Sequence, residues 1–358
     1  MNAEMQAFLA AIRDDPDDGP RLVFADWLTE NDKPRWAELI RLQVQLSHLA
    51  YDDPRRPVLR QRERQLLDDM TETSVVAEMD YPVQIESFDR GLPASVSLPA
   101  RWFMASAERI LNFGPVPAVH LTAVAGHERQ LADCPYLQAL TDLSLWHNEL
   151  TTNGLSLLLD TPYLTNLQRL DLTDCQLDSK AGAVLAGSAG SRLTRLGHLS
   201  LNSNQLGNAG VHDLFCCDHW KHLGILELTD TGVNARLGLS AAYPHPSVHA
   251  LDLSYNTICF DTPQIDLLDC FSPLTTLSLR YCRLHPEHIS NLINSPAITT
   301  VRNLHLDGNM FDENVLRQLL DSPNLRNLHE LTLGKLPKRG ISKATREGLR
   351  ERYGIGGD

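Results

Sequence analysis

A leucine repeat of nearly constant length dominates the chain between Leu140 and Leu333. Successive copies are 27, 29, 27, 25, 26, 27 and 27 residues apart, counted at Leu143, Leu170, Leu199, Leu226, Leu251, Leu277, Leu304 and Leu331. Each of these leucines is followed by x-Leu, and most copies continue with x-x-Asn or x-x-Cys. A repeat of this length predicts a solenoid, in which every copy is one structural unit packed against its neighbours.

Within each copy, the alternation of leucines predicts a short strand with both leucines on one face. A helical pattern follows about ten residues later, at 153–160, 179–187, 208–217, 286–294 and 313–321. Parallel strands lie about 4.8 Å apart, whereas packed helices need about 8–10 Å. We therefore expect an α/β horseshoe with parallel strands on its concave face and helices on its convex face.

A polar or small residue recurs three positions after the second leucine of each strand. Across seven copies it is Asn148, Cys175, Asn204, Thr231, Asn256, Cys282 and Asn309, whereas the eighth copy has Leu336. Each of the seven can hydrogen-bond backbone groups inside a buried turn, so we expect a structural ladder. The period and the Asn/Cys usage over about 116–336 resemble the ribonuclease-inhibitor-like class of leucine-rich repeats. The resemblance implies a right-handed solenoid, and it names no function, because that class includes inhibitors, GTPase activators, adaptors and scaffolds.

The first 80 residues have helical patterns and a second resemblance. The segments 21–28 (RLVFADWL) and 36–43 (WAELIRLQ) resemble the repeat-companion domain that planctomycete bacteria place before repeat arrays. That family has D-D-x-x-R-L-V-Y-A-D-W-L-E-E followed by R-A-E-F-I-R-L-Q. Here Phe24 replaces Tyr, Thr29 replaces the first Glu, and Trp36 and Leu39 replace Arg and Phe. The resemblance covers roughly 4–48 and implies a bacterial source and no known activity.

The remaining patterns predict the domain organisation. Residues 83–88 and 93–98 bracket a turn at 89–91, so 81–115 is expected to be an N-terminal cap made of a hairpin and a helix. The α-helical companion domain is expected at 1–80 and the repeats at 116–336. A C-terminal capping helix and tail are expected at 337–358. We interpret Trp27 as core and Asp26 as a cap or an ion-pair partner of Arg41, and the arginine run at 55–64 as a solvated face.

Composition limits the classes of partner and compartment. The formal net charge of −13 disfavours nucleic acid as the main ligand. No apolar run approaches 18 residues and no basic-then-apolar leader precedes Met5, which predicts neither a membrane span nor a secretory signal. The seven cysteines have no framework spacing, so reduced cysteines and a cytoplasmic location are expected.

Few groups suggest catalysis or a cofactor. His285-Pro286-Glu287-His288 has spacing that could suit a metal, but Pro at a helix start is ordinary. Cys216 and Cys217 are expected on a helix beside His212 and His219, where core packing is favoured over a thiol nucleophile. We therefore predict no enzyme activity and no cofactor or metal.

The outward residues of the strands are the candidate binding residues. An acidic middle and an aromatic and basic cluster stand out there, formed by Trp146, Asp171, Glu227, Asp252, Tyr255, Arg280, Tyr281 and His305. One interpretation is that any solenoid exposes polar residues here and that the aromatic rings shield backbone. The other is a binding face, because Trp, Tyr and Arg dominate interface hot spots.

The sequence thus predicts a non-catalytic protein–protein interaction module that binds a protein partner, favoured to be basic, on the concave face. One alternative is a regulator of another enzyme, of the GTPase-activator or inhibitor type, with Arg280 or Arg283 reaching a nucleotide. A further alternative is an adaptor that links a partner of the N-terminal helices to one of the repeats. Neither nucleic acid nor membrane is expected as a partner, and no pattern indicates an oligomeric state.

Overall fold

The computed structural model describes residues 3–70, 83–112, 116–188, 190–234, 247–260, 271, 273–337 and 339–355. The chain divides into two compact units, Met1–Ser144 and Leu145–Asp358. Each unit is described by itself. Among the described residues, no helix combines the length and the apolar character needed to cross a membrane.

The first unit begins with helices α1 (Ala3–Asp14), α2 (Asp18–Glu30), α3 (Pro34–His48) and α4 (Arg56–Met70). Met5, Leu9 and Ile12 recur at helical spacing and form the buried stripe of α1. Pro34 starts α3, where its missing N–H costs nothing. Phe24 and Trp36 are fully buried and meet edge to face, with ring centroids 5.5 Å apart. These aromatic rings form the centre of the helical core.

Asp26 and Trp27 of α2 both lie near the surface of the helical core. The Arg41 guanidinium donates to Asp26 Oδ1 at 2.7 Å, which is the predicted ion pair. Trp27 is only half-buried, because its indole N–H donates to Glu4 Oε2 at 3.2 Å near the surface. Trp36, rather than Trp27, is the buried tryptophan of this core.

A hairpin and a small parallel sheet follow in the same unit. Strands β1 (Gln84–Asp89) and β2 (Leu92–Pro99) are antiparallel, and β3 (Ala118–Thr122) and β4 (Asp142–Ser144) continue the sheet in parallel. Helix α5 (Ala100–Asn112) joins β2 to β3, while α6 (Glu128–Ala132) and the 3-10 helix η2 (Pro135–Ala139) join β3 to β4. The predicted hairpin and its turn are present.

The hairpin turn is inserted against α3. The Gly91 N–H donates to Gln43 Oε1 at 2.6 Å, and the Trp36 indole N–H donates to Gly91 O at 2.7 Å. Gly91 has φ +80°, and a Cβ placed there would lie 2.3 Å from Ile40 Cγ1 and 2.5 Å from Ile40 Cα. Glycine is therefore required both by the left-handed backbone and by the close approach to α3.

In the second unit, short strands alternate with helices. The strands are β5 (Arg169–Asp171), β6 (His198–Ser200), β7 (Ile225–Glu227), β8 (Ala250–Asp252), β9 (Thr276–Ser278), β10 (Asn303–His305) and β11 (Glu330–Thr332). They are parallel neighbours in chain order. The helices are α7 (Thr151–Leu159), α8 (Ala181–Ala186), α9 (Gly207–Phe215), α11 (Pro286–Asn294), α12 (Glu313–Asp321) and α13 (Lys343–Tyr353). The 3-10 helices η3 (Leu164–Asn166), η4 (Gly190–Arg192), η5 (Pro296–Thr300) and η6 (Pro323–Leu325) begin the return toward the next strand.

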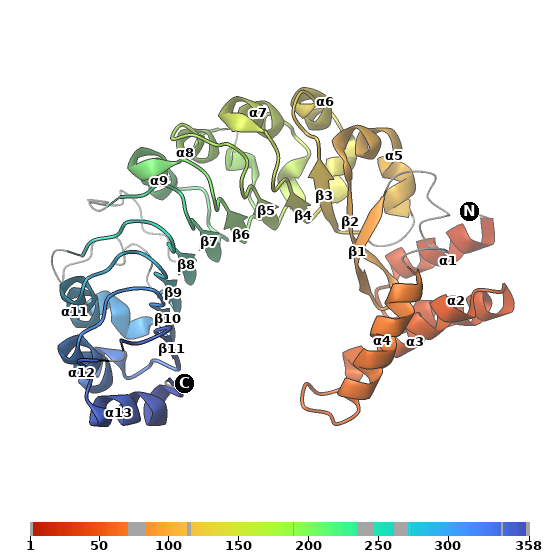
Figure 1. Ribbon diagram of the computed structural model, residues 1–358. Helices are drawn as coiled ribbons and strands as arrows, with labels where there is room; N and C mark the ends of the chain where they lie inside the picture. The colour runs from red at the N-terminus through yellow and green to blue at the C-terminus, as the bar shows by residue number, and fades with distance from the viewer. Residues whose placement is uncertain are drawn as a thin grey trace. The chain divides into compact units, whose positions relative to one another are not determined.

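Figure 1 shows the strands of this unit side by side along one edge and the helices along the opposite edge. The core lies between these two layers. All eight leucines of the repeat, counted from Leu143 to Leu331, are at most 3% exposed. The spacing of the leucines in the sequence is therefore the spacing of the layers of the core. Leu349 of α13 is fully buried at the C-terminal end, and Ser342 caps that helix by accepting a hydrogen bond from Thr345 N. Most of the predicted tail, 356–358, lies outside the described residues.

The polar residues after the strands hold the turns together. Asn204 Oδ1 accepts from the N–H groups of Cys175 and Leu177, at 3.1 and 3.0 Å, and its Nδ2 donates to Leu172 O and Leu201 O. Asn256 and Asn309 repeat this arrangement. Asn148, Cys175, Thr231 and Cys282 each donate to a strand carbonyl. Burial raises the pKa of the Cys175 and Cys282 thiols to about 12, so they remain protonated donors at neutral pH.

Candidate functional site

The candidate site is the strand face, which we define as the surface formed by the outward residues of β5–β11 and of the turns that follow them. The central residues of neighbouring strands lie in register, so that Glu227 is opposite Asp252, Asp252 is opposite Ser278, and Ser278 is opposite His305. Asp171 is separated from Glu227 by Ser200. The predicted acidic middle is therefore a Glu227–Asp252 pair with Asp171 two strands away.

Neighbouring groups orient the carboxylates of this row. Asp252 Oδ1 accepts from Ser254 N at 2.8 Å, and Asp171 Oδ1 accepts from Thr173 N at 3.0 Å in the same way. Glu227 accepts from the Asn202 side-chain amide at 3.1 Å, and His198 Nε2 lies 3.2 Å from its Oε1. His198 is the main cause of a lowered pKa at Glu227, although partial burial opposes it. Glu227 is consequently ionised at neutral pH.

Basic groups lie on the far side of the same row. Arg280 Nε is 3.2 Å from Asp307 Oδ2, and Asp307 also accepts from the Thr332 hydroxyl. His305 Nδ1 lies 3.2 Å from Thr332 Oγ1. Burial, with the nearby Arg280 charge as a further cause, lowers the pKa of His305 below its usual value, so its imidazole is neutral at pH 7.

A hollow of about 220 Å³ opens among these residues. Its lining includes Glu227, Asp252, Ser278, Arg280 and His305, together with Thr276 and the backbone of β7 and β8. The strand face thus brings together the acidic pair and two predicted basic residues. Sequence reasoning missed Thr276 as a lining residue, and the short side chain of Ser278 between Asp252 and His305 was the available signal for a hollow.

Tyr255 and Tyr281 lie at the turns directly after β8 and β9. Their rings stack with centroids 4.8 Å apart and an interplanar angle of 20°, yet they remain 56% and 51% exposed. Both have left-handed backbone, with φ of 59° and 53°. The equivalent turn position is left-handed in the other coils too, where it carries His147, Asp174, Ser203, Asp230 and Gly308. Bulky tyrosine is uncommon in this conformation, in contrast to Gly, Asp and His.

The ring of Tyr281 lies directly over Gly308 of the next coil. A Cβ built on Gly308 would come 2.2 Å from Tyr281 Cδ1. Gly308 therefore provides the space in which the second ring of the pair rests. The two tyrosines form a flat aromatic surface, which we call the tyrosine pair.

Trp146 lies outside the strand face, because it precedes β5 in the chain. It lies in the first coil of the second unit and is 40% exposed, with its ring centroid 4.4 Å from that of His147. His147 Nδ1 is 2.5 Å from Asp174 Oδ2, which joins this coil to the next. Trp146 and Asp171 therefore do not line the hollow, and Asp171 lies two strands before Glu227.

The groups weighed earlier for metal or thiol chemistry have structural roles. His285 is the N-cap of α11 and forms a reciprocal capping box with His288. Among the described residues, no group of three or more His, Cys, Asp and Glu is arranged to hold a metal ion. Cys216 and Cys217 follow α9 rather than lying on it, because the helix ends at Phe215. Burial raises the pKa of the Cys217 thiol, which disfavours the thiolate that a nucleophile needs.

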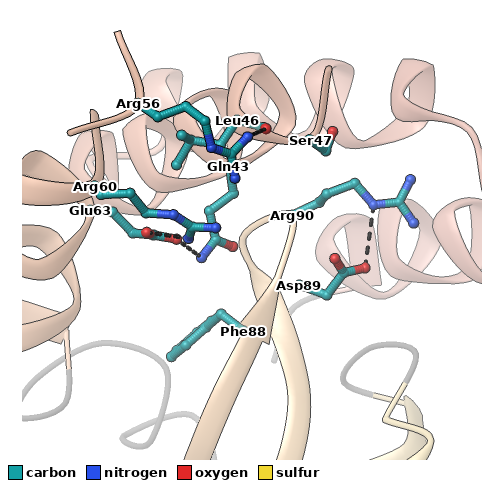
Figure 2. Close-up of a pocket in the computed structure, with 9 residues that line it drawn as sticks. All are labelled: Gln43, Leu46, Ser47, Arg56, Arg60, Glu63, Phe88, Asp89 and Arg90. Atoms are coloured by element: carbon teal, nitrogen blue, oxygen red, sulfur yellow. Dashed lines mark hydrogen bonds and ion pairs between the residues drawn. The ribbon is translucent and has the colours of Figure 1, made fainter. Parts of the chain in front are cut away.

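A polar pocket of about 260 Å³ lies in the first unit, between α3, α4 and the β1–β2 hairpin. Figure 2 shows Arg56, Arg60 and Glu63 on α4, and Asp89 and Arg90 on the hairpin. Arg56 donates to the carbonyls of Leu46 and Leu49, Arg60 to Glu63, and Arg90 to Asp18 and Pro16. These arginines hold the helices and the hairpin together.

The arginine run at 55–64 is largely exposed, as expected of a solvated face, but two of its members also hold α4 against α3. Arg56 caps the C-terminal carbonyls of α3, and Arg62 pairs with Glu38 of α3 at 2.7 Å. The Arg62 hydrogen bond is the main cause of a lowered pKa at Glu38. A run of arginines on one helix cannot reveal these partners, because they lie about 10 to 24 residues away in the sequence.

One family model identifies the type of repeat in this chain. A family model described as "Leucine Rich repeat" matches residues 163–186, which span the end of one coil and the strand and helix of the next. A crystal structure of TLR13 in complex with ssRNA13 is 21% identical, with a TM-score of 0.39, over 67% of this chain and 36% of that chain. The present chain thus spans about a third of that protein. A comparison with curated proteins finds no match. The repeat match and the strand–turn–helix coils support an α/β leucine-rich repeat architecture.

Proposed function

We propose that the chain is a non-catalytic binding scaffold whose strand face holds a protein partner. The observation that carries this proposal is the tyrosine pair, which is half-exposed although each residue pays for a left-handed backbone. Strained residues persist where the surrounding structure enforces them, and they cluster at functional sites. Asn or Gly would satisfy the same turn without strain, so selection for fold alone does not account for two large rings at this place.

The composition of the surface around the tyrosine pair also fits protein binding. Tyrosine and arginine provide most of the binding energy at protein interfaces, and here Arg280 lies beside Tyr281 in the chain. Asp252 ends β8, the strand that precedes Tyr255, and Glu227 ends the adjacent strand β7. The whole chain carries a formal charge of −13. This charge favours a basic partner and speeds its encounter at low salt, and it disfavours a nucleic-acid backbone.

The sequence patterns also suggest a class of repeat and a division into domains. We assign 116–336 to a right-handed horseshoe of the ribonuclease-inhibitor-like class, with the strand face as its concave side. Residues 1–80 are assigned to a bacterial repeat-companion domain, 81–115 to the N-terminal cap and 337–358 to the C-terminal cap. The proposed location is the cytoplasm.

A regulator of GTPases remains the alternative from a different class. That function needs an arginine free to reach a nucleotide. Arg280 lies against Asp307, whereas Arg283 is exposed at the following turn with φ 56°. The ion pair of Arg280 favours a binding surface over a mobile catalytic finger. Stimulated GTP hydrolysis by a small GTPase that is lost in an Arg283→Ala variant would favour the regulator instead.

The test of the binding proposal is capture of a partner from a lysate of the source organism, followed by identification and repetition with the purified partner. The variant is Tyr255→Asn/Tyr281→Asn, because asparagine tolerates left-handed backbone and so removes the rings without harming the turn. The control is Ser203→Asn at the equivalent turn position of another coil, where φ is 55°.

We expect the purified partner to bind the wild type and the Ser203→Asn control equally. Binding by the double tyrosine variant should fall at least about tenfold, because loss of one interface hot spot alone costs roughly 2 kcal/mol. Equal binding by all three proteins would show that the strand face around the tyrosine pair is not the binding site.

A further inference from the structure

We propose that the hollow on the strand face receives one basic side chain, an arginine or a lysine, from an extended segment of the partner. This inference rests on the proposed function and makes it specific. It assigns recognition of the cation to Glu227 and Asp252, and it assigns contact with the flanking residues of the same segment to the tyrosine pair and Arg280.

The size of the hollow follows from the row of side chains across β7–β10. Glu227 and Asp252 lie on one side and His305 on the other, while Ser278 between them is short and almost fully buried. The Ser278 hydroxyl is hydrogen-bonded to Ser254 Oγ at 2.8 Å, so its position at the bottom of the hollow is fixed. The resulting volume of about 220 Å³ is below the 300–1,000 Å³ typical of small-molecule sites, and it suits a single side chain.

The charge of the hollow favours a cation. Glu227 and Asp252 are opposite one another on adjacent parallel strands, which are roughly 4.8 Å apart. Arg280 is balanced by Asp307, and His305 is neutral at pH 7. The lining therefore carries one net negative charge, two carboxylates against the Arg280 guanidinium, with His198 Nε2 3.2 Å from Glu227 Oε1. A guanidinium or ammonium group between the two carboxylates would relieve their repulsion and form charge-assisted hydrogen bonds.

Arg280 supplies a donor at the edge of the hollow. Its Nε atom is buried and makes no hydrogen bond to the described residues, although the side chain is 43% exposed and Nε lies 3.2 Å from Asp307 Oδ2 in an ion pair. A buried donor of this kind normally has an acceptor. A backbone carbonyl of a bound peptide would supply one, which is why we assign an extended segment rather than a free cation.

The experiment measures binding of capped tripeptides by saturation-transfer difference NMR, which detects weak ligands of a large protein. The probes are acetyl-Gly-Arg-Gly-amide, acetyl-Gly-Lys-Gly-amide and, as a neutral match, acetyl-Gly-citrulline-Gly-amide. The variants are Glu227→Gln and Asp252→Asn, which preserve side-chain size. Asp171→Asn is the matched control, because Asp171 bonds a backbone N–H as Asp252 does but does not line the hollow.

We expect saturation transfer to the side-chain methylenes of the arginine or lysine probe and not to those of citrulline. Each hollow variant should weaken binding about tenfold, the control should bind as the wild type does, and 0.5 M salt should abolish binding. Binding of citrulline equal to that of arginine, or an equal loss in the Asp171→Asn control, would overturn the assignment of the hollow.

The two proposals fail separately. If no tripeptide binds while partner capture still depends on Tyr255 and Tyr281, the strand face is an interface and the hollow is not its cation site. If the tripeptide binds and partner capture is unaffected by the tyrosines, the hollow recognises a cation but the tyrosine pair has another role. If neither result is positive, both proposals are wrong.

Discussion

At the scale of single residues, the backbone conformation of the turns decides which side chains can serve as a surface. The turn position before each ladder residue is left-handed in coil after coil. Most coils satisfy it with residues that tolerate this backbone, such as Asp174 and Gly308. Tyr255 and Tyr281 are the departures, and they are also the exposed aromatic pair. These two residues therefore combine an unfavourable left-handed backbone with an exposed aromatic ring.

The ladder asparagines should matter more for stability than their exposed neighbours. Asn204→Ala removes the acceptor for Cys175 N and Leu177 N in a buried turn. We expect a loss of roughly 3 kcal/mol in the free energy of unfolding, because each buried donor left without a partner costs about 1–3 kcal/mol. Urea denaturation measures the change. Gln205→Ala, next in the chain and exposed, should shift stability by less than about 0.5 kcal/mol. Equal effects would show that the ladder bonds contribute nothing specific.

Substitution of Gly91 and of Gly126 by alanine separates the cost of a steric clash from the cost of left-handed backbone. Both have φ +80°, but a Cβ at Gly91 would strike the Ile40 backbone, whereas a Cβ at Gly126 has nothing within 4 Å. Gly126→Ala should cost about 1 kcal/mol for the left-handed backbone alone. Gly91→Ala should cost at least about 3 kcal/mol, since strain from overpacking is added. Thermal melts of both variants measure the difference. Similar melting temperatures would mean that the hairpin turn can move away from α3 freely.

At the scale of elements, the second unit ends in a helix that is docked by one carboxylate. Glu313, in the first turn of α12, accepts from Ser342 N at 2.8 Å and from the Thr345 hydroxyl at 2.7 Å, just where α13 begins. Arg317 of α12 donates to the same carboxylate at 2.7 Å. These hydrogen bonds, with that from Ser342 N the largest cause, lower the pKa of Glu313 to about 2 from its ordinary 4.5.

This docking predicts a defined pH dependence. A carboxylate whose pKa is lower in the folded state stabilises the fold fully above its unfolded pKa, here 4.5, and the contribution is lost as pH falls toward 2. The melting temperature of Glu313→Gln should therefore lie below that of the wild type at pH 7, and the two should converge between pH 4.5 and about 2. Glu351→Gln, an exposed carboxylate on α13, serves as the control and should track the wild type throughout. A gap between wild type and Glu313→Gln that persists at pH 2 would contradict the charge-based explanation.

At the scale of the whole molecule, the repeated strands and helices could be predicted from the sequence. Contacts between side chains that are far apart in the sequence could not. The spacing of the leucines located every strand of the repeat that the structure describes, because the core itself has that period. The helix at 313–321 was predicted with its observed bounds, since Asp312 is a strong cap and the apolar stripe is regular. By contrast, the helix predicted at 208–217 ends two residues earlier, at Phe215, because an apolar Cys-Cys pair continues the pattern after the chain has left the helix.

The sequence predicted which outward strand residues form the candidate site, but it did not predict the hollow among them. Register in a parallel stack places Glu227, Asp252, Ser278 and His305 in one row, and this could be derived from the repeat. The hollow depends on side-chain orientation, such as that of Arg280 toward Asp307, which spacing does not encode. The arginine contacts of α4 were missed for the same reason. Their partners lie on another helix, at distances along the chain that follow no period.

The seating of Gly91 on α3 also limits how this chain can be divided. Trp36 and Gln43 satisfy their buried polar groups with the backbone of Gly91. A fragment that ends near residue 80 would leave an indole N–H and an amide of the helical core without those partners and would uncover the surface around Ile40. The N-terminal helices and the hairpin that follows them therefore form one packing unit, and a stable fragment of this part of the chain has to contain both.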